Sequence, residues 1–179
     1  MKLLFNSFLL FLFCTISYAQ NSNSNIELGI PKTTIFTPSD YNGEAQSFDF
    51  IQDDKGVMFV ANTVGFLEFN GTSWRSFKPD NDGVPISFLK DKKGRIYTGG
   101  TSFIGYLDIN KKGETEFVSL KDKLPKDFSM GIIWKILEVN DVLYFKNDKN
   151  IISYQKCCIN LFELFETHWR TEPVITPLN

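Results

Sequence analysis

The chain has 179 residues, of which 42% are hydrophobic and 22% charged, and its formal net charge is −2. This balance permits a packed core and argues against global disorder. Because no large basic field exists, nucleic acid is not an expected partner of this segment, and membrane contact is expected only through an export signal. Eighteen Phe and six Tyr against one His favour β structure over a metal site.

The first 19 residues have the layout of a secretory signal peptide. Lys2 supplies a positive charge, residues 3–16 are almost wholly apolar, and small Ser17 and Ala19 precede Gln20. The apolar run is shorter than the roughly 20 residues of a membrane-spanning helix. We therefore predict cleavage between Ala19 and Gln20 and an exported, periplasmic or extracellular protein, with an uncleaved membrane anchor as the alternative.

Residues 20–34 are expected to form a flexible entry segment, and residues 35–156 contain an internal repeat. Gly56 and Gly94 align at a spacing of 38, whereas Gly65-Phe66-Leu67 and Gly105-Tyr106-Leu107 align at 40, which predicts a two-residue insertion between them. A third unit lies 85 residues after the first without a gap, and Asn140-Asp141 replaces Lys55-Gly56 there.

Each unit reads as four short antiparallel strands. Its first two strands are joined by Asp-x-x-Gly or Asn-Asp, which suit a tight hairpin. Residues 57–60 are apolar on both faces, so the second strand is expected to be covered on both sides. The predicted fold class is all-β: an incomplete β-propeller with about three blades, near residues 46–77, 84–119 and 130–155.

Three blades leave two blade faces open, because propellers typically close with four to eight. The sequence is therefore expected to be a fragment of a longer protein, or to self-associate through its open faces. Residues 157–179 depart from the repeat and form an atypical tail. Two alternatives stay open for it: a short helix with Leu161, Leu164, Phe165 and Trp169 on one face, or an out-of-frame segment.

No residue is predicted to be catalytic, to bind a cofactor or to bind a metal. His168 reads as an incidental surface residue, and adjacent Cys157 and Cys158 offer no disulfide framework. Asp53, Asp54 and Asp91 resemble paired carboxylates or Ca²⁺ ligands, but their repeat positions favour a role in the hairpins. Gly99-Gly100-Thr101 lacks the Lys-Ser/Thr and the helix of a phosphate loop, so it is interpreted as a strand-end turn.

Ligand-binding residues are left undetermined by these patterns. Five aromatic residues could stack on a sugar or another planar ligand, although core packing explains most of them better: Tyr41, Trp74, Phe103, Tyr106 and Trp134. Propellers usually bind ligands on loops around the central channel. The inter-blade segments 79–85 and 124–131 are therefore the best candidates for an unknown ligand or envelope partner.

The repeated pattern resembles the two-component regulator propeller family over about residues 35 to 155. The pattern is Asp-x-x-Gly, an apolar strand, Gly-Thr or Asn-Thr, and then Gly-aromatic-Leu. The residues that carry it are Asp53, Gly56, Phe59, Thr63, Gly65, Phe66, Leu67 and Phe69, then Asp91, Gly94, Tyr97, Gly100, Thr101, Gly105, Tyr106 and Leu107. Phe59 and Tyr97 stand where the family often has Trp.

The resemblance implies the non-catalytic N-terminal part of a bacterial cell-envelope sensor. In such proteins further blades, a β-sandwich, a membrane helix and a histidine kinase or DNA-binding output domain follow. None of those parts can be assigned to this chain. Two alternatives remain: a truncated secreted propeller enzyme of lyase or glycosidase type, and a small envelope interaction protein that closes its ring by oligomerising.

Overall fold

A computed structural model describes residues 33–155, 158–164 and 175–177. In this part the chain is all-β, as predicted, except for α2 (Pro38–Tyr41) and the 3₁₀ segment η1 (Lys121–Lys123). No helix within these ranges is long and apolar enough to cross a bilayer. The predicted cleavage site between Ala19 and Gln20 lies outside the described residues, as does His168.

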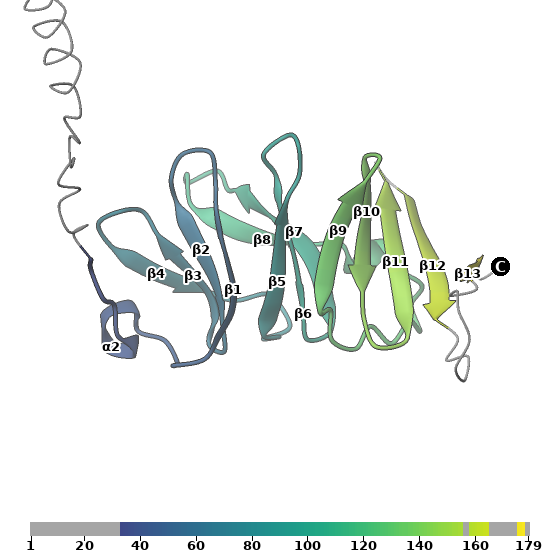
Figure 1. Ribbon diagram of the computed structural model, residues 1–179, viewed down its shortest axis with the longest axis horizontal. Coiled ribbons are helices and arrows are strands. Elements are labelled where there is room, and N and C mark those ends of the chain that lie inside the picture. Colours follow the sequence, from purple (N-terminus) through teal and green to yellow (C-terminus); the bar gives the residue numbers. More distant parts are fainter. Residues whose placement is uncertain (1–32, 156–157, 165–174, 178–179) are drawn as a thin grey trace, which may run out of the picture. The chain divides into compact units, whose positions relative to one another are not determined.

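The strands form three antiparallel sheets, and strands consecutive in sequence are neighbours in each sheet (Figure 1). The first sheet comprises β1 (Ser47–Gln52), β2 (Met58–Asn62), β3 (Gly65–Phe69) and β4 (Trp74–Phe77). The second comprises β5 (Pro85–Lys90), β6 (Ile96–Gly100), β7 (Phe103–Ile109) and β8 (Thr115–Ser119). The third comprises β9 (Lys135–Val139), β10 (Val142–Lys146), β11 (Asn150–Gln155), β12 (Cys158–Leu164) and β13 (Ile175–Pro177).

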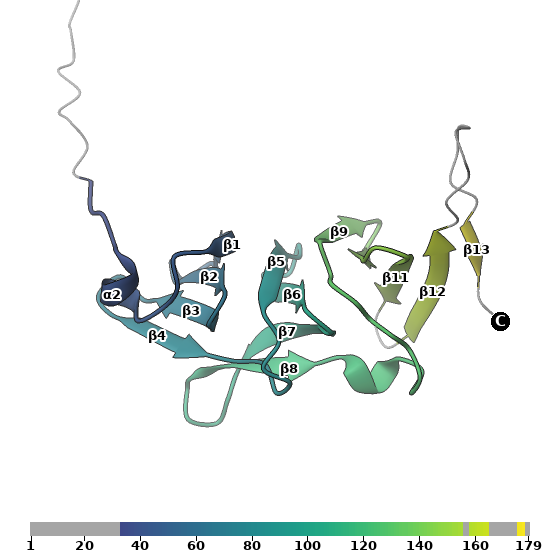
Figure 2. The ribbon, with the colours of Figure 1, turned by 90° about the horizontal axis from the view of Figure 1, so that it is seen from below.

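The first strands of the three sheets, β1, β5 and β9, follow one another in space (Figures 1 and 2). The hairpins β1–β2, β5–β6 and β9–β10 therefore lie at one end of the sheets, at the top of Figure 1, which we call the hairpin end. The turns β2–β3, β6–β7 and β10–β11 and the β4–β5 and β8–β9 connections lie at the other end, the loop end.

The first interface, between the first and second sheets, is built mainly of phenylalanine. Phe66 is fully buried, and its ring centroid lies 5.1 Å from that of Phe77 and 5.9 Å from that of Phe88. The buried cluster consists of Phe59, Ala61, Phe66, Phe88, Ile96, Phe103 and Leu107. Offset or tilted ring pairs of this kind stabilise a core beyond their buried area.

The second interface, between the second and third sheets, is aliphatic with three tyrosines. Its buried cluster consists of Tyr97, Ile104, Leu120, Leu124, Met130, Ile133, Ile136, Leu143, Phe145 and Ile152, with Tyr106 and Tyr154 packed against it. Strand β6 lies between the two interfaces and is buried at every position. In β2, by contrast, Met58 and Val60 stay half-buried. The expectation that residues 57–60 are covered on both sides is therefore wrong, because only the middle sheet has a neighbour on each face.

The pairing register corrects the predicted insertion. Asn62 pairs with Gly65 in the first sheet and Gly100 pairs with Phe103 in the second, so both turns have the same length. The spacing of 38 continues into β7, and Phe103 rather than Gly105 takes the place of Gly65. A shift of two residues leaves each side chain on the same face of a strand, so hydrophobic patterning alone did not distinguish 38 from 40.

Gly105 occupies the place of Leu67 in this corrected alignment. A Cβ atom at Gly105 would overlap the carbonyl oxygen of Val118 and the ring of Phe117. The ring of Phe117 lies 5.1 Å from that of Phe103, so it belongs to the first interface. The phenylalanine of β8 thus fills the space that a β7 side chain would otherwise take.

The third unit also differs in register from the prediction. Met58 pairs with Gln52, whereas Leu143 pairs with Glu138, so the β9–β10 hairpin is one residue shorter than the β1–β2 hairpin. Asn140 and Asp141 have φ values of 51° and 62°, the left-handed conformation of a tight hairpin. The unit therefore has a one-residue deletion relative to the first, and the ungapped alignment is wrong at this hairpin.

Part of the atypical tail belongs to the third sheet. Cys158–Leu164 forms strand β12 and pairs with β11 from Asn150 to Gln155, where a short helix was one of the two expectations. Ile159 and Leu161 alternate along β12 and pack against the second interface. The period of two, together with the open edge of β11, explains a strand here. Phe165 and Trp169 lie outside the described residues.

Candidate functional site

The acidic residues of the first two hairpins are held by the backbone. Asp53 Oδ1 accepts hydrogen bonds from the amides of Lys55, at 2.9 Å, and Val57, at 2.8 Å. Asp91 Oδ1 accepts the equivalent bonds from Lys93, at 2.9 Å, and Arg95, at 2.8 Å. These bonds fix tight turns, so the interpretation of both residues as hairpin formers is confirmed.

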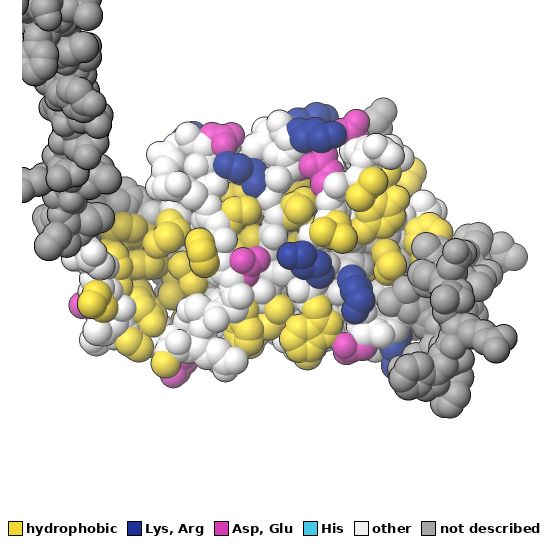
Figure 3. Space-filling model, viewed as in Figure 1, with side chains coloured by type: hydrophobic (Ala, Val, Ile, Leu, Met, Phe, Trp, Pro, Cys, Tyr) yellow, Lys and Arg dark blue, Asp and Glu magenta, His cyan; other side chains and the backbone are white. Residues whose placement is uncertain are grey.

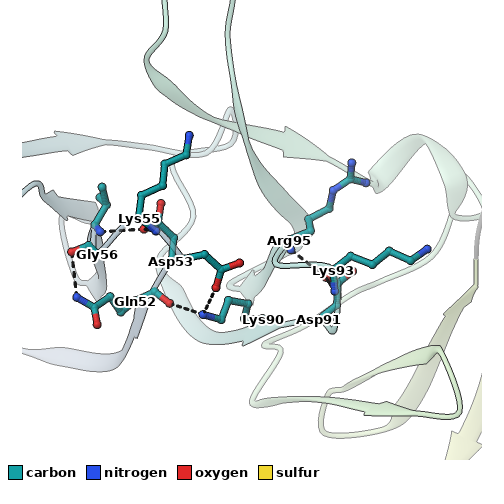
Figure 4. A network of polar contacts seen from close by, with 10 residues as sticks. Gln52, Asp53, Lys55, Gly56, Lys90, Asp91, Lys93 and Arg95 are labelled. Carbon is teal, nitrogen blue, oxygen red and sulfur yellow. Dashed lines mark hydrogen bonds and ion pairs between the residues drawn. The ribbon is translucent and has the colours of Figure 1, made fainter.

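Lysines of the second sheet connect the hairpins to one another. Lys90 Nζ donates to the Gln52 carbonyl at 3.0 Å and to Asp54 Oδ1 at 2.8 Å, as Figure 4 shows. Lys92 Nζ pairs with Asp141 at 3.2 Å. Asp54 therefore serves an ion pair between sheets, and both signs of charge lie side by side near the hairpin tips at the top of Figure 3.

Four of the five candidate aromatic residues pack on other protein groups. Tyr41 and Trp74 lie 5.5 Å apart in a cluster with Phe36 and Phe69 on the outer face of the first sheet. Phe103 is buried in the first interface, and Tyr106 lies beneath the guanidinium of Arg95 at 4.6 Å.

Trp134 is the exception among the candidate aromatic residues. Its side chain is 46% exposed, and its Nε1 donates to Asp148 Oδ1 at 2.7 Å. This bond fixes the indole at the loop end while leaving part of the ring open to a ligand. Of the five, Trp134 alone combines an exposed ring with a fixed orientation.

The structure brings the two candidate loops, 79–85 and 124–131, to the same β6–β7 turn. Asn81 Nδ2 donates to the Ser102 carbonyl at 3.1 Å, and the Ser102 amide donates to the Gly131 carbonyl at 2.8 Å. Gly99 faces Ile133 of the second loop so closely that a Cβ atom would come within 2.6 Å of its side chain. Gly99-Gly100 therefore allows close packing at the end of β6, consistent with a strand-end turn and not a phosphate loop.

A pair of buried asparagines, which sequence reasoning missed, anchors the entry segment and the second loop. Asn62 Nδ2 donates to the Glu44 carbonyl at 2.7 Å, and Asn147 Nδ2 donates to the Met130 carbonyl at 2.6 Å. Asn147 Oδ1 also accepts the Lys149 amide at 2.8 Å. The two asparagines are 85 residues apart, so the repeat spacing already carried this signal.

A cavity of about 440 Å³ opens at the loop end beside these anchors. It is lined by Asp127, Phe128, Ser129, Gly131, Asn147, Asp148, Lys149 and Asn150. The candidate loop 124–131 contributes half of this lining, and the partner of Trp134, Asp148, contributes to the rest. Most of the lining is polar, which suits a hydroxyl-rich or charged ligand.

Two further cavities lie between the hairpins at the other end. One of about 300 Å³ separates the hairpins of the first and second sheets and includes Asp54, Lys55 and Lys93. The other, of about 570 Å³, separates the hairpins of the second and third sheets and includes Arg95, Tyr97 and Tyr154. Both are bounded by charged hairpin residues on an apolar floor.

Within residues 33–155, 158–164 and 175–177, no cluster of three or more His, Cys, Asp or Glu side chains could hold a metal ion. Comparison with known proteins found no matching family model, curated protein or solved structure. The chemistry of the site therefore rests on the cavities, the anchored loops and Trp134.

Proposed function

We propose that this chain is the non-catalytic, ligand-binding beginning of an extracytoplasmic sensor whose three sheets are blades of a β-propeller. Three features support the propeller: four-stranded antiparallel units, first strands that follow one another, and a spacing of 38 residues between the first two units. The signal-peptide pattern of residues 1–19 supports export. The resemblance to two-component regulator propellers supports the role in sensing.

The ligand site in this proposal is the loop-end cavity. The observation that carries it is the meeting of loop 124–131 with the β10–β11 turn around a polar cavity of about 440 Å³, next to the exposed ring of Trp134. A fixed indole beside Asp127, Asp148 and Lys149 is suited to stack on a sugar ring while polar groups bind its hydroxyls. The ligand is accordingly proposed to be a carbohydrate.

Trp134 supplies the readout that tests this site. A panel of neutral and acidic oligosaccharides is titrated into the purified chain while tryptophan fluorescence is recorded. We expect a saturable change with at least one oligosaccharide, and we expect Trp134→Phe to abolish it. The matched control is Trp74→Phe, which changes an indole of the outer aromatic cluster. Saturable binding that Trp134→Phe leaves unchanged would refute the loop-end site.

Export is tested separately with a reporter enzyme that is active only outside the cytoplasm. Residues 1–60, fused to alkaline phosphatase in a bacterial host, are expected to give active enzyme and an N-terminus at Gln20. Deletion of residues 3–16 should abolish the activity. Equal activity with and without this run would contradict an extracytoplasmic location.

A second candidate function, self-association, is favoured by the outer faces of the first and third sheets. Phe50 is 74% exposed on β1, and Leu137 and Val139 are each 51% exposed on β9. At the spacing of 38, Phe50 corresponds to Phe88, which is 8% exposed in the first interface. Such a face suits another blade-like sheet. Light scattering of the chain and of Phe50→Lys tests this: a concentration-dependent oligomer that the substitution weakens supports self-association, and a monomer at all concentrations excludes it.

A further inference from the structure

We propose that the cavity between the hairpins of the second and third sheets binds a small organic carboxylate, with Arg95 as the group that binds the carboxylate. This site lies at the hairpin end and does not depend on the loop-end carbohydrate site. The cavity measures about 570 Å³, within the range of small-molecule sites. Side chains of both sheets form it, so it exists only where the two sheets meet.

Arg95 is placed to bind an anion. Its guanidinium carbon lies 4.6 Å from the ring centroid of Tyr106, and stacking on that ring holds the planar group without using its N–H donors. In Figure 4 the Arg95 side chain points away from the Lys90 network. Among the described residues Arg95 forms no ion pair, so its charge remains available for a ligand.

A second arginine shows what a purely structural version of this arrangement looks like. Arg75 is stacked on Phe77 at 4.8 Å, but its guanidinium pairs with Glu68 and donates to the Thr115 carbonyl at 2.8 Å. Its donors therefore serve the protein itself. Arg95 has the same stacking geometry but no carboxylate partner, and it borders a cavity.

Tyrosine rings form the walls of the cavity beside Arg95. Tyr97 comes from β6 and Tyr154 from β11, and their centroids are 6.2 Å apart. Leu143 supplies an apolar surface between the sheets. Burial raises the pKa of Tyr97, although its interaction with Arg95 partly offsets this, so its hydroxyl stays protonated and able to donate a hydrogen bond. These walls suit a ligand whose carboxylate is attached to an aromatic or aliphatic group.

The remaining charges favour one carboxylate over many. Lys92 is already paired with Asp141 at 3.2 Å across the mouth of the cavity. Glu138 also lines the cavity and forms no ion pair among the described residues. A second negative charge on the ligand would approach Glu138 and be repelled, whereas a ligand amine would be attracted. Monocarboxylates and amino acids therefore share the chemistry that this cavity recognises.

The test uses 3-phenylpropionate, its neutral amide and phenylalanine as probes of the purified chain, with binding followed by amide chemical shifts. We expect saturable shifts around Arg95 and Tyr97 with 3-phenylpropionate and none with the amide. Arg95→Gln should weaken binding by at least about tenfold, because charge-assisted bonds supply the specificity. Arg75→Gln is the matched control and should leave binding unchanged. Tighter binding of phenylalanine would assign the site to amino acids, and weaker binding would assign it to simple acids.

A second variant keeps the proposal testable if Arg95→Gln does not fold. Glu138→Gln removes the opposing carboxylate and should tighten binding of 3-phenylpropionate about two- to threefold, by removal of an exposed like-charge repulsion. Equal shifts with the acid and the amide would overturn the proposal. So would unchanged binding by folded Arg95→Gln, or unchanged or weaker binding by Glu138→Gln.

Discussion

The two interfaces that join the three sheets are built from different side chains and leave different amounts of space. In the first, the ring of Phe66 lies 5.1 to 6.1 Å from the rings of Phe77, Phe88, Phe103 and Phe117. In the second, aliphatic residues pack with three tyrosines, and the cavity at its hairpin end is about 570 Å³, against about 300 Å³ at the first.

The arginines at these interfaces differ in the same way. Arg75 connects β4 to β8 through the Thr115 carbonyl and is neutralised by Glu68. Arg95 lies at the second interface and pairs with no carboxylate of the described residues. The comparison indicates that the first interface is committed to stability and that the second retains polar capacity for a ligand.

The largest expected effect comes from Phe66→Ala in the first interface. Phe66 is fully buried, so its removal should cost about 3–5 kcal/mol of unfolding free energy through lost burial and a residual cavity. Phe50→Ala, at a side chain that is 74% exposed, should cost about 0.5 kcal/mol or less in the monomer. Urea denaturation measures both, and similar losses would contradict the assignment of the core.

Gly105→Ala should be the next most damaging substitution. The new methyl group overlaps the Phe117 ring and the Val118 carbonyl, so we expect a loss of about 1–3 kcal/mol from overpacking. The double variant with Phe117→Leu should lose less than the sum of the two single losses, because the smaller side chain makes room. Strict additivity in a thermal denaturation series would show that Phe117 does not set the requirement for glycine.

Asn147→Ala tests the anchor of the second interface. It leaves the Met130 carbonyl and the Lys149 amide without their side-chain partner, which should cost about 1–3 kcal/mol. Asn110→Ala is the control, since Asn110 Oδ1 accepts the Lys112 amide at 2.9 Å in an exposed hairpin. Its loss should be smaller because water can replace the bond. An equal loss in both variants would argue against a buried anchor.

The two arginines should separate in stability as well as in binding. Arg75→Gln removes a charge-assisted contact between two sheets and should cost about 1 kcal/mol after solvent screening. Arg95→Gln should cost less than about 0.5 kcal/mol, because no carboxylate partner is lost. The midpoints of urea unfolding at low and moderate salt measure this difference. A greater loss for Arg95→Gln would reverse the comparison.

The smallest expected effect is alkaline. Burial raises the pKa of Tyr97 above its ordinary value of 10.0, so the neutral form is favoured in the folded state. Its contribution to stability is therefore fully present below pH 10 and is lost as pH rises through the higher folded pKa. Between pH 9 and 11, Tyr97→Phe should lose less stability than the unsubstituted chain in urea titrations. Parallel pH profiles would show that this hydroxyl is not buried.

The sequence predicted the hairpins well because their chemistry is local. Asp53 and Asp91 bind amides within four residues, and Asn70 Oδ1 likewise accepts the Thr72 amide at 3.0 Å in the β3–β4 turn. The candidate loops 79–85 and 124–131 were also recognisable as connections between units. Their joint contact with the β6–β7 turn was not, because it depends on hydrogen bonds between residues about 20 to 30 positions apart.

Errors arose where several arrangements satisfied the same local pattern. An alignment at 40 keeps the same faces buried as one at 38, and only the pairing of Gly100 with Phe103 decides between them. Residues 158–164 can be arranged with apolar side chains on a helix face, but the free edge of β11 offers a partner for a strand. Arg95 carried no motif at all, since its importance comes from the ring beneath it and the cavity beside it.

By itself the sequence determined the all-β class, the spacing between units and the turns, because these follow from short-range periodicity and backbone preference. Only the tertiary structure decided which faces are covered, where the extra residues of the second unit lie, and which of two stacked arginines is neutralised. Those outcomes depend on how separate sheets meet, and the contacts that fix them join residues far apart in the chain.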